Sequence, residues 1–280
     1  MKATRIKRFI IGTSAAALVG LSLLIPIPAN AAHEMIYAVD QDNNLFNFWS
    51  DAPGTILGQY AINGVQNAEE IRGLDYWNGT LYGLGSFGYL YTITTGGIAT
   101  PVDGLFAPPL SGATFGVDNG PSGFQVVGNL GQNLLIDRTT GQVISVGPNV
   151  PTRVDALAYD PVSGNWYAGN TLSDNLATLN PITGVLSPIG PFGIDASRYN
   201  GLDISPFSGI MYMGTPAVSS DPQANLYTIS TATGFATLVG QIGQPNEGIL
   251  VRGLTVVPEP GGVALLALGA LGLLFARRQQ

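Results

Sequence analysis

Three aspartates recur at one place in a short repeated pattern of glycine, an apolar residue and aspartate: Asp75, Asp118 and Asp203. Two carboxylates held near each other are the groups that glycosidases use, one as an acid and the other as a base or nucleophile. Two further copies of the pattern carry Ala158 and Thr255 at this place. A catalytic acid has no reason to recur by symmetry. We therefore expect the aspartates to accept hydrogen bonds from the next hairpin and set strand register, with catalysis as the alternative.

A second set of residues stands three positions before the aspartate place: Arg72, Phe115, Asp155, Asn200 and Arg252. If the copies form a closed ring, Arg72 and Arg252 come from neighbouring units and face one end of its axis. Guanidinium groups bind carboxylates in bidentate geometry. We predict an anion-binding or carboxylate-binding site formed by Arg72, Arg252, Asp155 and Asn200. The alternative is internal pairing of the arginines with one of four acids: Asp155, Glu69, Glu70 or Glu247.

Asp40, Asp42, Asn44 and Asp51 occupy the first, third, fifth and twelfth positions of a possible calcium loop. The sixth position is Leu45, where such a loop needs glycine for its sharp turn. The segment also alternates like a hairpin, in which Asp and Asn cap their own backbone. A hairpin is therefore expected, with Ca²⁺ at Asp40, Asp42 and Asn44 as the alternative and no other cofactor.

The chain contains no cysteine and one histidine, His33. Ser-His-Asp and Cys-His catalysis therefore lack a base, and zinc or copper sites lack nitrogen and sulfur ligands. The fold must also hold without disulfides. Carboxylate chemistry and oxygen-bound cations are the classes of chemistry that remain.

Residues 32–260 hold five arginines, no lysine and all eighteen acidic residues, so their formal charge is −13. Phosphate binding needs clustered cations, and this composition excludes nucleic acid as a partner.

A repeat organises most of the chain. Leucines that mark equivalent strands are spaced 45, 44, 42 and 50 residues apart: Leu45, Leu90, Leu134, Leu176 and Leu226. Each copy contains four short alternating stretches separated by Gly, Asn or Asp, which is typical of a propeller blade. The sequence predicts an all-β propeller of five four-stranded blades, with a β-sandwich as the alternative. We expect residues 251–257 (VRGLTVV) to supply the inner strand that the N-terminal strands lack and so close the ring.

Both ends of the chain carry targeting features. Residues 1–31 read as a signal peptide with a basic start, an apolar run and a small-residue cleavage site at Ala29 and Ala31, so the exported chain is expected to begin at Ala32. An uncleaved anchor is the alternative. The C-terminal apolar stretch, residues 261–276, would span about 24 Å as a helix, and the arginines after it can snorkel to make up the difference from about 30 Å of hydrocarbon.

The segment 257–280 resembles the PEP-CTERM sorting signal of Gram-negative, exopolysaccharide-producing bacteria. The resemblance rests on Pro258, Glu259 and Pro260, then an apolar stretch, then Arg277 and Arg278 at the chain end. It implies transient anchoring in the inner membrane, with residues 32–256 outside, and then removal of the helix by exosortase, a membrane-embedded cysteine transpeptidase-like enzyme. The product would be released or attached at the outer surface; a permanent anchor is the alternative.

The stretches RGLDYWNGTLYGLGS, TFGVDNGPSGFQVVGNLGQNLLID and LYTISTATGFATLVGQIG resemble a secreted, propeller-like domain family of undefined function. That resemblance brings no activity with it.

These observations predict three parts: a signal peptide (1–31), a propeller domain (32–256) and a sorting signal (257–280). We expect a non-enzymatic cell-surface or extracellular-matrix protein that is processed by signal peptidase and exosortase and binds a glycan, a peptide or a matrix protein. No residue is assigned as catalytic. The alternative is a carboxylate-dependent enzyme that acts on polysaccharide.

Overall fold

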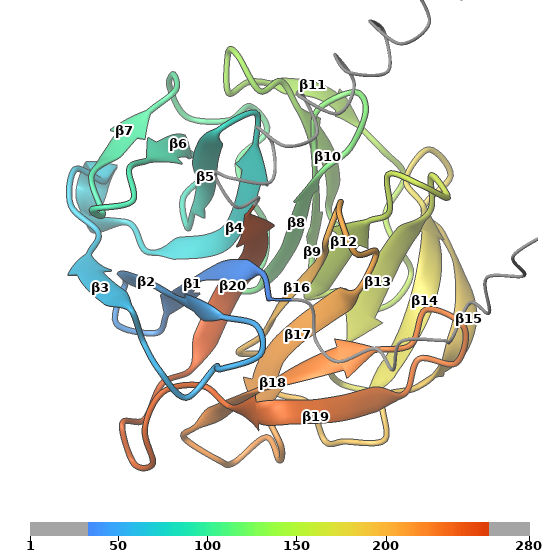
Figure 1. Cartoon of the computed structure of the whole chain (residues 1–280). Coiled ribbons are helices and arrows are strands. Elements are labelled where there is room, and N and C mark those ends of the chain that lie inside the picture. Colours follow the sequence, from blue (N-terminus) through green and yellow to red (C-terminus); the bar gives the residue numbers. More distant parts are fainter. Residues whose placement is uncertain (1–32, 258–280) are drawn as a thin grey trace, which may run out of the picture. The chain divides into compact units, whose positions relative to one another are not determined.

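The computed structural model describes residues 33–257, which form five four-stranded antiparallel sheets arranged around a central axis (Figure 1). This confirms the predicted five-bladed propeller. The predicted signal peptide with Ala29, Ala31 and Ala32, and the sorting residues Pro258, Glu259, Pro260, Arg277 and Arg278, lie outside the described residues. Among residues 33–257, no helix has the length and apolar composition needed to span a bilayer.

Each blade is a meander that starts at the axis and ends at the rim. Blade 1 consists of β20 (Val251–Val257), β1 (Met35–Asp40), β2 (Asn44–Trp49) and β3 (Gly58–Ala61). Blade 2 consists of β4 (Ile71–Trp77), β5 (Thr80–Gly85), β6 (Leu90–Ile93) and β7 (Ala99–Pro101). Blade 3 consists of β8 (Phe115–Asn119), β9 (Phe124–Gly128), β10 (Asn133–Ile136) and β11 (Val143–Val146).

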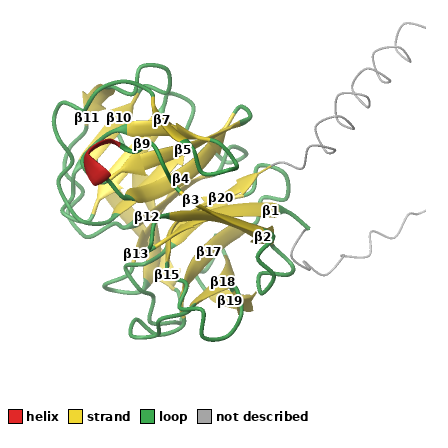
Figure 2. Ribbon diagram, turned by 90° about the vertical axis from the view of Figure 1, so that its left-hand side faces the viewer, coloured by secondary structure: helices red, strands yellow, loops and turns green. Residues whose placement is uncertain are grey.

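Blade 4 consists of β12 (Ala156–Tyr159), β13 (Trp166–Asn170), β14 (Asn175–Asn180) and β15 (Val185–Pro191). Blade 5 consists of β16 (Gly201–Ile204), β17 (Met211–Pro216), β18 (Ala224–Ile229) and β19 (Ala236–Gln241). Figure 2 shows that strands and loops make up nearly all of the described chain, with the 3-10 helix η1 (Gln66–Ala68) in red.

The ring closes where the first and last described strands pair. β20 runs antiparallel to β1, with Met35 opposite Val257 and Val39 opposite Gly253. The predicted closing strand is therefore confirmed, and it ends one residue beyond the expected domain boundary at 256. Since one blade is built from both ends of the domain, the ring cannot open without breaking this ladder.

The core lies between blades, because each sheet buries both faces against its neighbours. Ile36 and Phe48 of blade 1, for example, share a buried cluster with Leu226 of blade 5. Similar clusters lie between every other pair of adjacent blades. This arrangement explains why β9, near the axis, is buried along its whole length while the rim strand β11 is largely exposed.

Small residues form a collar where the inner strands approach one another: Gly73, Gly116, Ala156, Gly201 and Gly253. A Cβ on Gly253 would lie 2.6 Å from the backbone nitrogen of Leu74, and one on Gly201 would lie 2.5 Å from that of Leu254. These glycines are required by close backbone approach between blades. The collar narrows the axis to a cavity of about 10 Å³ and so separates the two ends of the channel.

Candidate functional site

Polar side chains gather at both ends of the central channel. Arg72 and Arg252 stand near the starts of β4 and β20, whereas Asp75 and Thr255 stand three residues further along the same strands. Three residues of extended chain span about 10 Å. We call the end with the aspartates the acidic end and the end with the arginines the arginine end.

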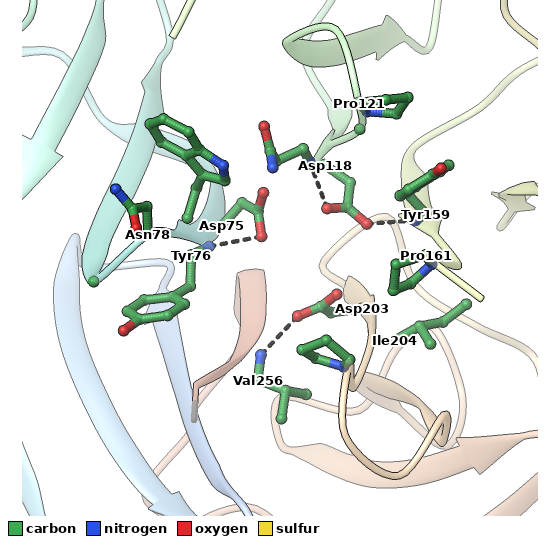
Figure 3. A pocket seen from close by; sticks show the side chains of 15 residues that line it. Asp75, Tyr76, Asn78, Asp118, Pro121, Tyr159, Pro161, Asp203, Ile204 and Val256 are labelled. Atoms are coloured by element: carbon green, nitrogen blue, oxygen red, sulfur yellow. Dashed lines mark hydrogen bonds between the residues drawn. The ribbon is translucent and has the colours of Figure 1, made fainter. Parts of the chain in front are cut away.

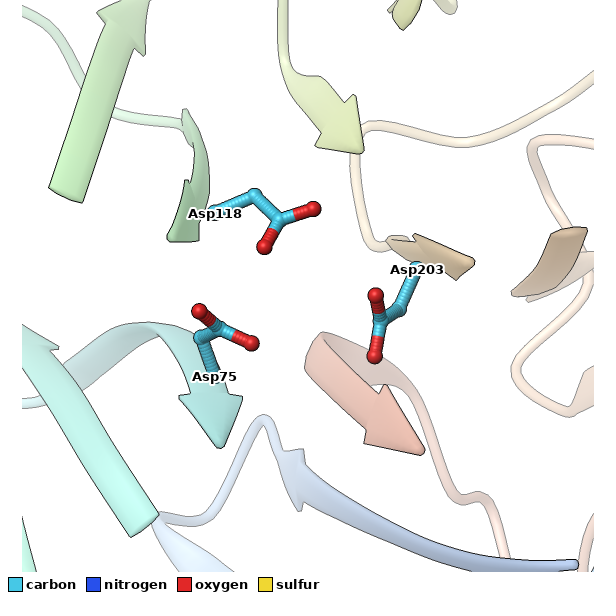
Figure 4. A group of neighbouring side chains, drawn as sticks. All are labelled: Asp75, Asp118 and Asp203. Atoms are coloured by element: carbon cyan, nitrogen blue, oxygen red, sulfur yellow. The ribbon is translucent and has the colours of Figure 1, made fainter. Parts of the chain in front are cut away.

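The acidic end brings together the three aspartates of the repeat. Asp75, Asp118 and Asp203 project from β4, β8 and β16, and one carboxylate oxygen of each lies within 4.8 Å of the others (Figure 4). Their exposed fractions are 4%, 5% and 6%. Propeller symmetry thus turns one repeated sequence position into a buried carboxylate cluster.

Two of these carboxylates tie neighbouring blades together. Asp118 Oδ2 accepts a hydrogen bond from the backbone N–H of Tyr159 in the next inner strand. Asp203 Oδ2 likewise accepts from the backbone N–H of Val256 in β20, at 2.6 Å (Figure 3). This geometry is the one expected for a structural role in setting strand register.

Asp75 is held differently. Its Oδ1 atom accepts from the backbone N–H of Tyr76 at 2.6 Å and lies 3.3 Å from the hydroxyl of Thr255. Its Oδ2 atom is buried and has no hydrogen-bond partner among the described residues. Unless a proton is shared with the neighbouring Asp118 carboxyl, the protein alone does not satisfy this oxygen.

Burial raises the pKa of all three carboxyl groups. The pKa of Asp75 rises to about 6 through burial, against hydrogen bonds that favour the charged form. The pKa of Asp118 is raised by burial and then by the charges of Asp75 and Asp203, and that of Asp203 by burial and the charge of Asp75. Within residues 33–257 no arginine or histidine forms an ion pair with the cluster. Its negative charge must therefore be relieved by protons or by a bound cation.

An open cavity of about 610 Å³ leads to the cluster (Figure 3). Tyr76, Trp77 and Tyr159 line it together with prolines of the surrounding loops. The guanidinium of Arg138 lies 4.9 Å from the centre of the Trp77 ring. The acidic end thus combines buried carboxylates with aromatic walls.

At the arginine end, Arg72 and Arg252 meet on one carboxylate. Arg72 Nη2 pairs with Glu70 Oε2, and Arg252 Nη1 lies 2.8 Å from the same oxygen. The two arginines come from neighbouring blades, as the ring model requires. The internal pairing that was the alternative in the sequence is also present, with Glu70 as the partner.

Several buried polar atoms at this end have no hydrogen-bond partner among the described residues: Arg72 Nε, Arg252 Nε and Asn200 Oδ1. Burial and the nearby charge of Arg252 lower the pKa of Arg72, although a guanidinium remains charged in proteins. The Tyr199 ring lies 5.2 Å from the guanidinium carbon of Arg198 and 6.0 Å from that of Arg252. These residues line a cavity of about 300 Å³.

Comparison with known proteins now places the domain. Residues 44–255 match the model of a family described as a domain of unknown function, DUF4394. The chain belongs to the DUF4394 family. The match reaches all five blades and leaves out β1, and the family description assigns it no activity.

The end of the chain matches a second model. Residues 256–279 match the PEP-CTERM protein-sorting motif, which confirms the resemblance seen in the sequence. The chain is therefore an exported protein with a C-terminal sorting signal of the kind that exosortase processes.

Curated proteins and solved structures add little. No curated protein matches the chain. Similar structures include a protein of unknown function from Bacteroides caccae (10% identity, 81% of this chain and 100% of that one, TM-score 0.46). A chain of a nidogen/laminin complex gives 10% identity over 81% of this chain and 86% of that one, with a TM-score of 0.47. Glutaminyl cyclase of Myxococcus xanthus gives 16% identity over 74% of this chain and 95% of that one, with a TM-score of 0.44. These similarities are too distant to transfer any property to the DUF4394 domain.

Two other predicted ligand residues of the DUF4394 domain, Asp155 and Asn200, line the cavity at the arginine end. They differ in how far the protein already satisfies their hydrogen bonds. Asp155 accepts from Arg153 Nε at 2.6 Å and from the Thr171 hydroxyl at 2.7 Å, so the protein already engages it. Asn200 donates to the carbonyl of Ser197 at 3.1 Å and keeps its side-chain oxygen unpaired. Asn200 is therefore the better placed of the two to contact a ligand.

The possible calcium segment of the DUF4394 domain forms a hairpin. Asp40 Oδ1 accepts from the backbone N–H groups of Asp42 and Asn44 at 2.9 and 2.8 Å, and its Oδ2 accepts from the Asn44 amide at 2.9 Å. Asp51 follows the far end of β2 and contacts His33 at 2.9 Å. Calcium binding by Asp40, Asp42 and Asn44 stays a prediction, but this geometry favours the hairpin interpretation because donors already occupy the Asp40 oxygens.

Several residues that line the cavities at the two ends of the channel were not predicted from the sequence. Arg198 and Tyr199 belong to the loop before β16, whose composition does not repeat between blades although loops of equal length precede β4, β12 and β20. Tyr76 and Trp77 follow Asp75 directly, and Tyr159 follows the equivalent position of blade 4. The recurrence of aromatic residues just after the aspartate place was the available signal for a lined cavity.

Proposed function

We propose that this DUF4394 protein is a non-enzymatic surface or matrix protein whose arginine end binds the carboxylate group of an acidic glycan. One observation carries the proposal: two arginines from neighbouring blades converge on a single carboxylate oxygen while buried donors beside it remain unpaired. A buried donor without a partner costs free energy, and a ligand oxygen that pairs with it recovers this cost.

Glu70 supports a carboxylate as the ligand group. Its side chain is 41% exposed, whereas those of Arg72 and Arg252 are 25% and 11% exposed. The arginines are thus more deeply buried than the acid that they bind. A ligand carboxylate can displace Glu70 or share the two guanidinium groups with it.

The cavity supports a small glycan unit. Its volume of about 300 Å³ is at the lower end of the range for small-molecule sites. Tyr199 offers an aromatic ring with a polar hydroxyl, which suits the apolar and hydroxyl-bearing sides of a sugar.

The position of the site also suits a surface protein. β20 ends at the acidic end, where Val256 contacts Asp203. The described chain therefore ends at the acidic end, and the arginine end lies on the other side of the collar of small residues. We expect the arginine end, opposite the point where the described chain ends, to stay accessible to extracellular ligands while the protein is sorted.

The experiment compares oligoglucuronate with a neutral glucose oligomer of equal length by isothermal titration calorimetry on the full-length chain in detergent. Oligoglucuronate should bind, and the neutral oligomer should not. Arg72→Gln and Arg252→Gln should each weaken binding at least about tenfold, the loss of a charge-assisted pair. Arg138→Gln, at the acidic end, is the matched control and should leave binding unchanged.

Three results would count against the proposal. They are equal binding of both oligomers, binding that survives loss of both arginines, and binding of a peptide C-terminal carboxylate in place of the glycan. Binding should also weaken as salt is added, since it depends on ion pairing.

A second candidate is a carboxylate-dependent enzyme that acts on polysaccharide at the acidic end. The raised pKa of Asp75, to about 6, beside two other carboxyl groups favours it, because a glycosidase needs one protonated and one ionised carboxyl. Hydrolysis of an oligosaccharide by the wild type that is lost in Asp75→Asn, with unfolding unchanged, would support this candidate. A wild type without hydrolytic activity would leave the binding proposal in place.

A further inference from the structure

We propose that Asp75, Asp118 and Asp203 bind a divalent cation, with Ca²⁺ as the best fit, on the axis of the propeller at its acidic end. This inference concerns the opposite end of the channel from the glycan proposal and does not depend on it. It would give the repeated aspartates a second task besides holding strand register.

The spacing of the oxygens fits one ion. Ca²⁺ binds carboxylate oxygens at about 2.4 Å, so two oxygens on the same ion lie at most about 4.8 Å apart. One oxygen from each of the three carboxylates meets this limit with both others. Figure 4 shows the three side chains directed from three blades into the same space.

The hydrogen bonding leaves a place for a ligand. Asp75 Oδ2 has no hydrogen-bond partner among the described residues. Water cannot readily reach it either, because Asp75 is only 4% exposed. An unsatisfied carboxylate oxygen in such a place is costly unless a proton or a cation meets it. A cation in contact with Asp75 Oδ2 would satisfy this atom and would also be attracted by Asp118 and Asp203.

The surroundings hold the carboxylates in position as ligands. Backbone N–H groups of Tyr76, Tyr159 and Val256 each donate to one of the three aspartates. Bonds of this kind fix the side-chain rotamer and favour the ionised form, which is the form that binds metal. The inner strands therefore orient the oxygens before any ion arrives.

The charge of the aspartate cluster and the cavity that leads to it both fit a bound cation. Among residues 33–257 no basic side chain pairs with the cluster, so a divalent ion would neutralise most of its charge. The cavity of about 610 Å³ gives an entry path and room for water ligands. Oxygen ligands and flexible ligand number are typical of Ca²⁺ sites.

The test uses Tb³⁺ as a luminescent probe and Ca²⁺ as its competitor, with the full-length chain in detergent after treatment with chelator. Trp77, Tyr76 and Tyr159 line the cavity and would sensitise Tb³⁺ bound at the cluster. We expect sensitised emission that Ca²⁺ displaces, and a rise in Tm when Ca²⁺ is added to the metal-free protein. Asp75→Asn should weaken Ca²⁺ binding at least about tenfold, the loss of a charged ligand.

Asp42→Asn is the matched control, because it removes a carboxylate from the predicted calcium hairpin and leaves the axial cluster intact. It should bind Ca²⁺ as the wild type does. The inference is overturned if the wild type shows neither sensitised emission nor a Tm shift at about 10 mM Ca²⁺, well above the weakest extracellular sites. It is equally overturned if Asp42→Asn, and not Asp75→Asn, abolishes binding. If Asp75→Asn does not fold, calorimetry on the wild type and on Asp42→Asn still decides: one Ca²⁺ bound per chain by both proteins supports the axial site, and no Ca²⁺ bound by the wild type refutes it.

Discussion

Met35 and Val257 lie opposite each other in the antiparallel ladder of β1 and β20. The first and last strands of the described domain thus share one blade and enter and leave at the same end of the channel. Val257, near the start of the matched sorting motif, is therefore a neighbour of the first described strand. This relationship makes ring closure depend on β20, the strand directly before the sorting motif.

Leu254→Ala should destabilise the domain markedly. Leu254 is 2% exposed and packs in the cluster between blades 5 and 1. Removing a buried leucine side chain typically costs about 2–5 kcal/mol of unfolding free energy, and here the loss falls on the closing strand. Urea denaturation measures it. Leu57→Ala, at a position 48% exposed, should stay within about 0.5 kcal/mol of wild type; equal effects would contradict the assigned role of β20.

Gly253→Ala should also destabilise, for a steric reason. The added Cβ would lie 2.6 Å from the Leu74 nitrogen and 3.0 Å from the Gly73 carbonyl carbon, both of them backbone atoms. Neighbouring inner strands would have to move apart, which we expect to cost about 1–3 kcal/mol. Gly104→Ala adds a Cβ with no atom within 4 Å and is the control. Thermal unfolding of the two variants compares them directly, and an unchanged Tm for Gly253→Ala would show that the collar is not tightly packed.

Glu70→Gln should strengthen binding of oligoglucuronate if the arginine end binds carboxylates. The amide keeps the shape of the side chain but removes the charge that engages Arg72 and Arg252. The two guanidinium groups would then be free for the ligand, and we expect a gain of about two- to fivefold, the value of one exposed ion pair. Titration calorimetry in low salt gives the affinity. Weaker binding by Glu70→Gln would instead assign Glu70 to the ligand contacts.

Metal-free protein should lose stability as pH rises from about 4 to above 6. Burial raises the pKa of Asp75 from 3.8 to about 6, so the folded state holds a proton that the unfolded chain has already released in this range. Stability is then greatest below the unfolded pKa and falls as pH rises through the folded one, by on the order of 3 kcal/mol for Asp75. Tm measured in chelator between pH 4 and 8 tests this.

Asp75→Asn should flatten the same pH profile, because the amide does not titrate. Added Ca²⁺ should flatten the wild-type profile as well, if the cation takes the place of the proton. A wild-type Tm that rises steadily with pH in chelator would contradict the assignment of these buried carboxyl groups.

Much of the fold could be predicted from local pattern. Alternation with period two marked β2 at Asn44–Trp49 and β18 at Ala224–Ile229 almost to the residue. The spacing of the repeat gave the blade number, and the surplus stretch VRGLTVV indicated how the ring closes. These features are local because a strand needs only alternating side chains and turns at its ends.

The site was predicted less completely. The repeat identified Asp75 and Arg72 as equivalent positions in their blades, but not which ends of the channel their side chains occupy. It could not show that Glu70 is shared by Arg72 and Arg252, since the equivalent positions before the other inner strands carry no acid. The calcium pattern at Asp40 and Asp51 looked plausible in sequence, yet the hairpin places these residues at opposite ends of its strands.

The sequence alone predicted the blade count, the strand positions and the sorting signal, and it contains no cysteine and a single histidine. The tertiary structure decided that three aspartates converge within 4.8 Å, that one of their oxygens is left unpaired, and that the arginines gather at the other end. The physical reason is that strand formation depends on neighbours along the chain, whereas contacts across the axis depend on how five sheets pack around it. Residues more than one hundred positions apart, such as Asp75 and Asp203, become neighbours only when the ring closes.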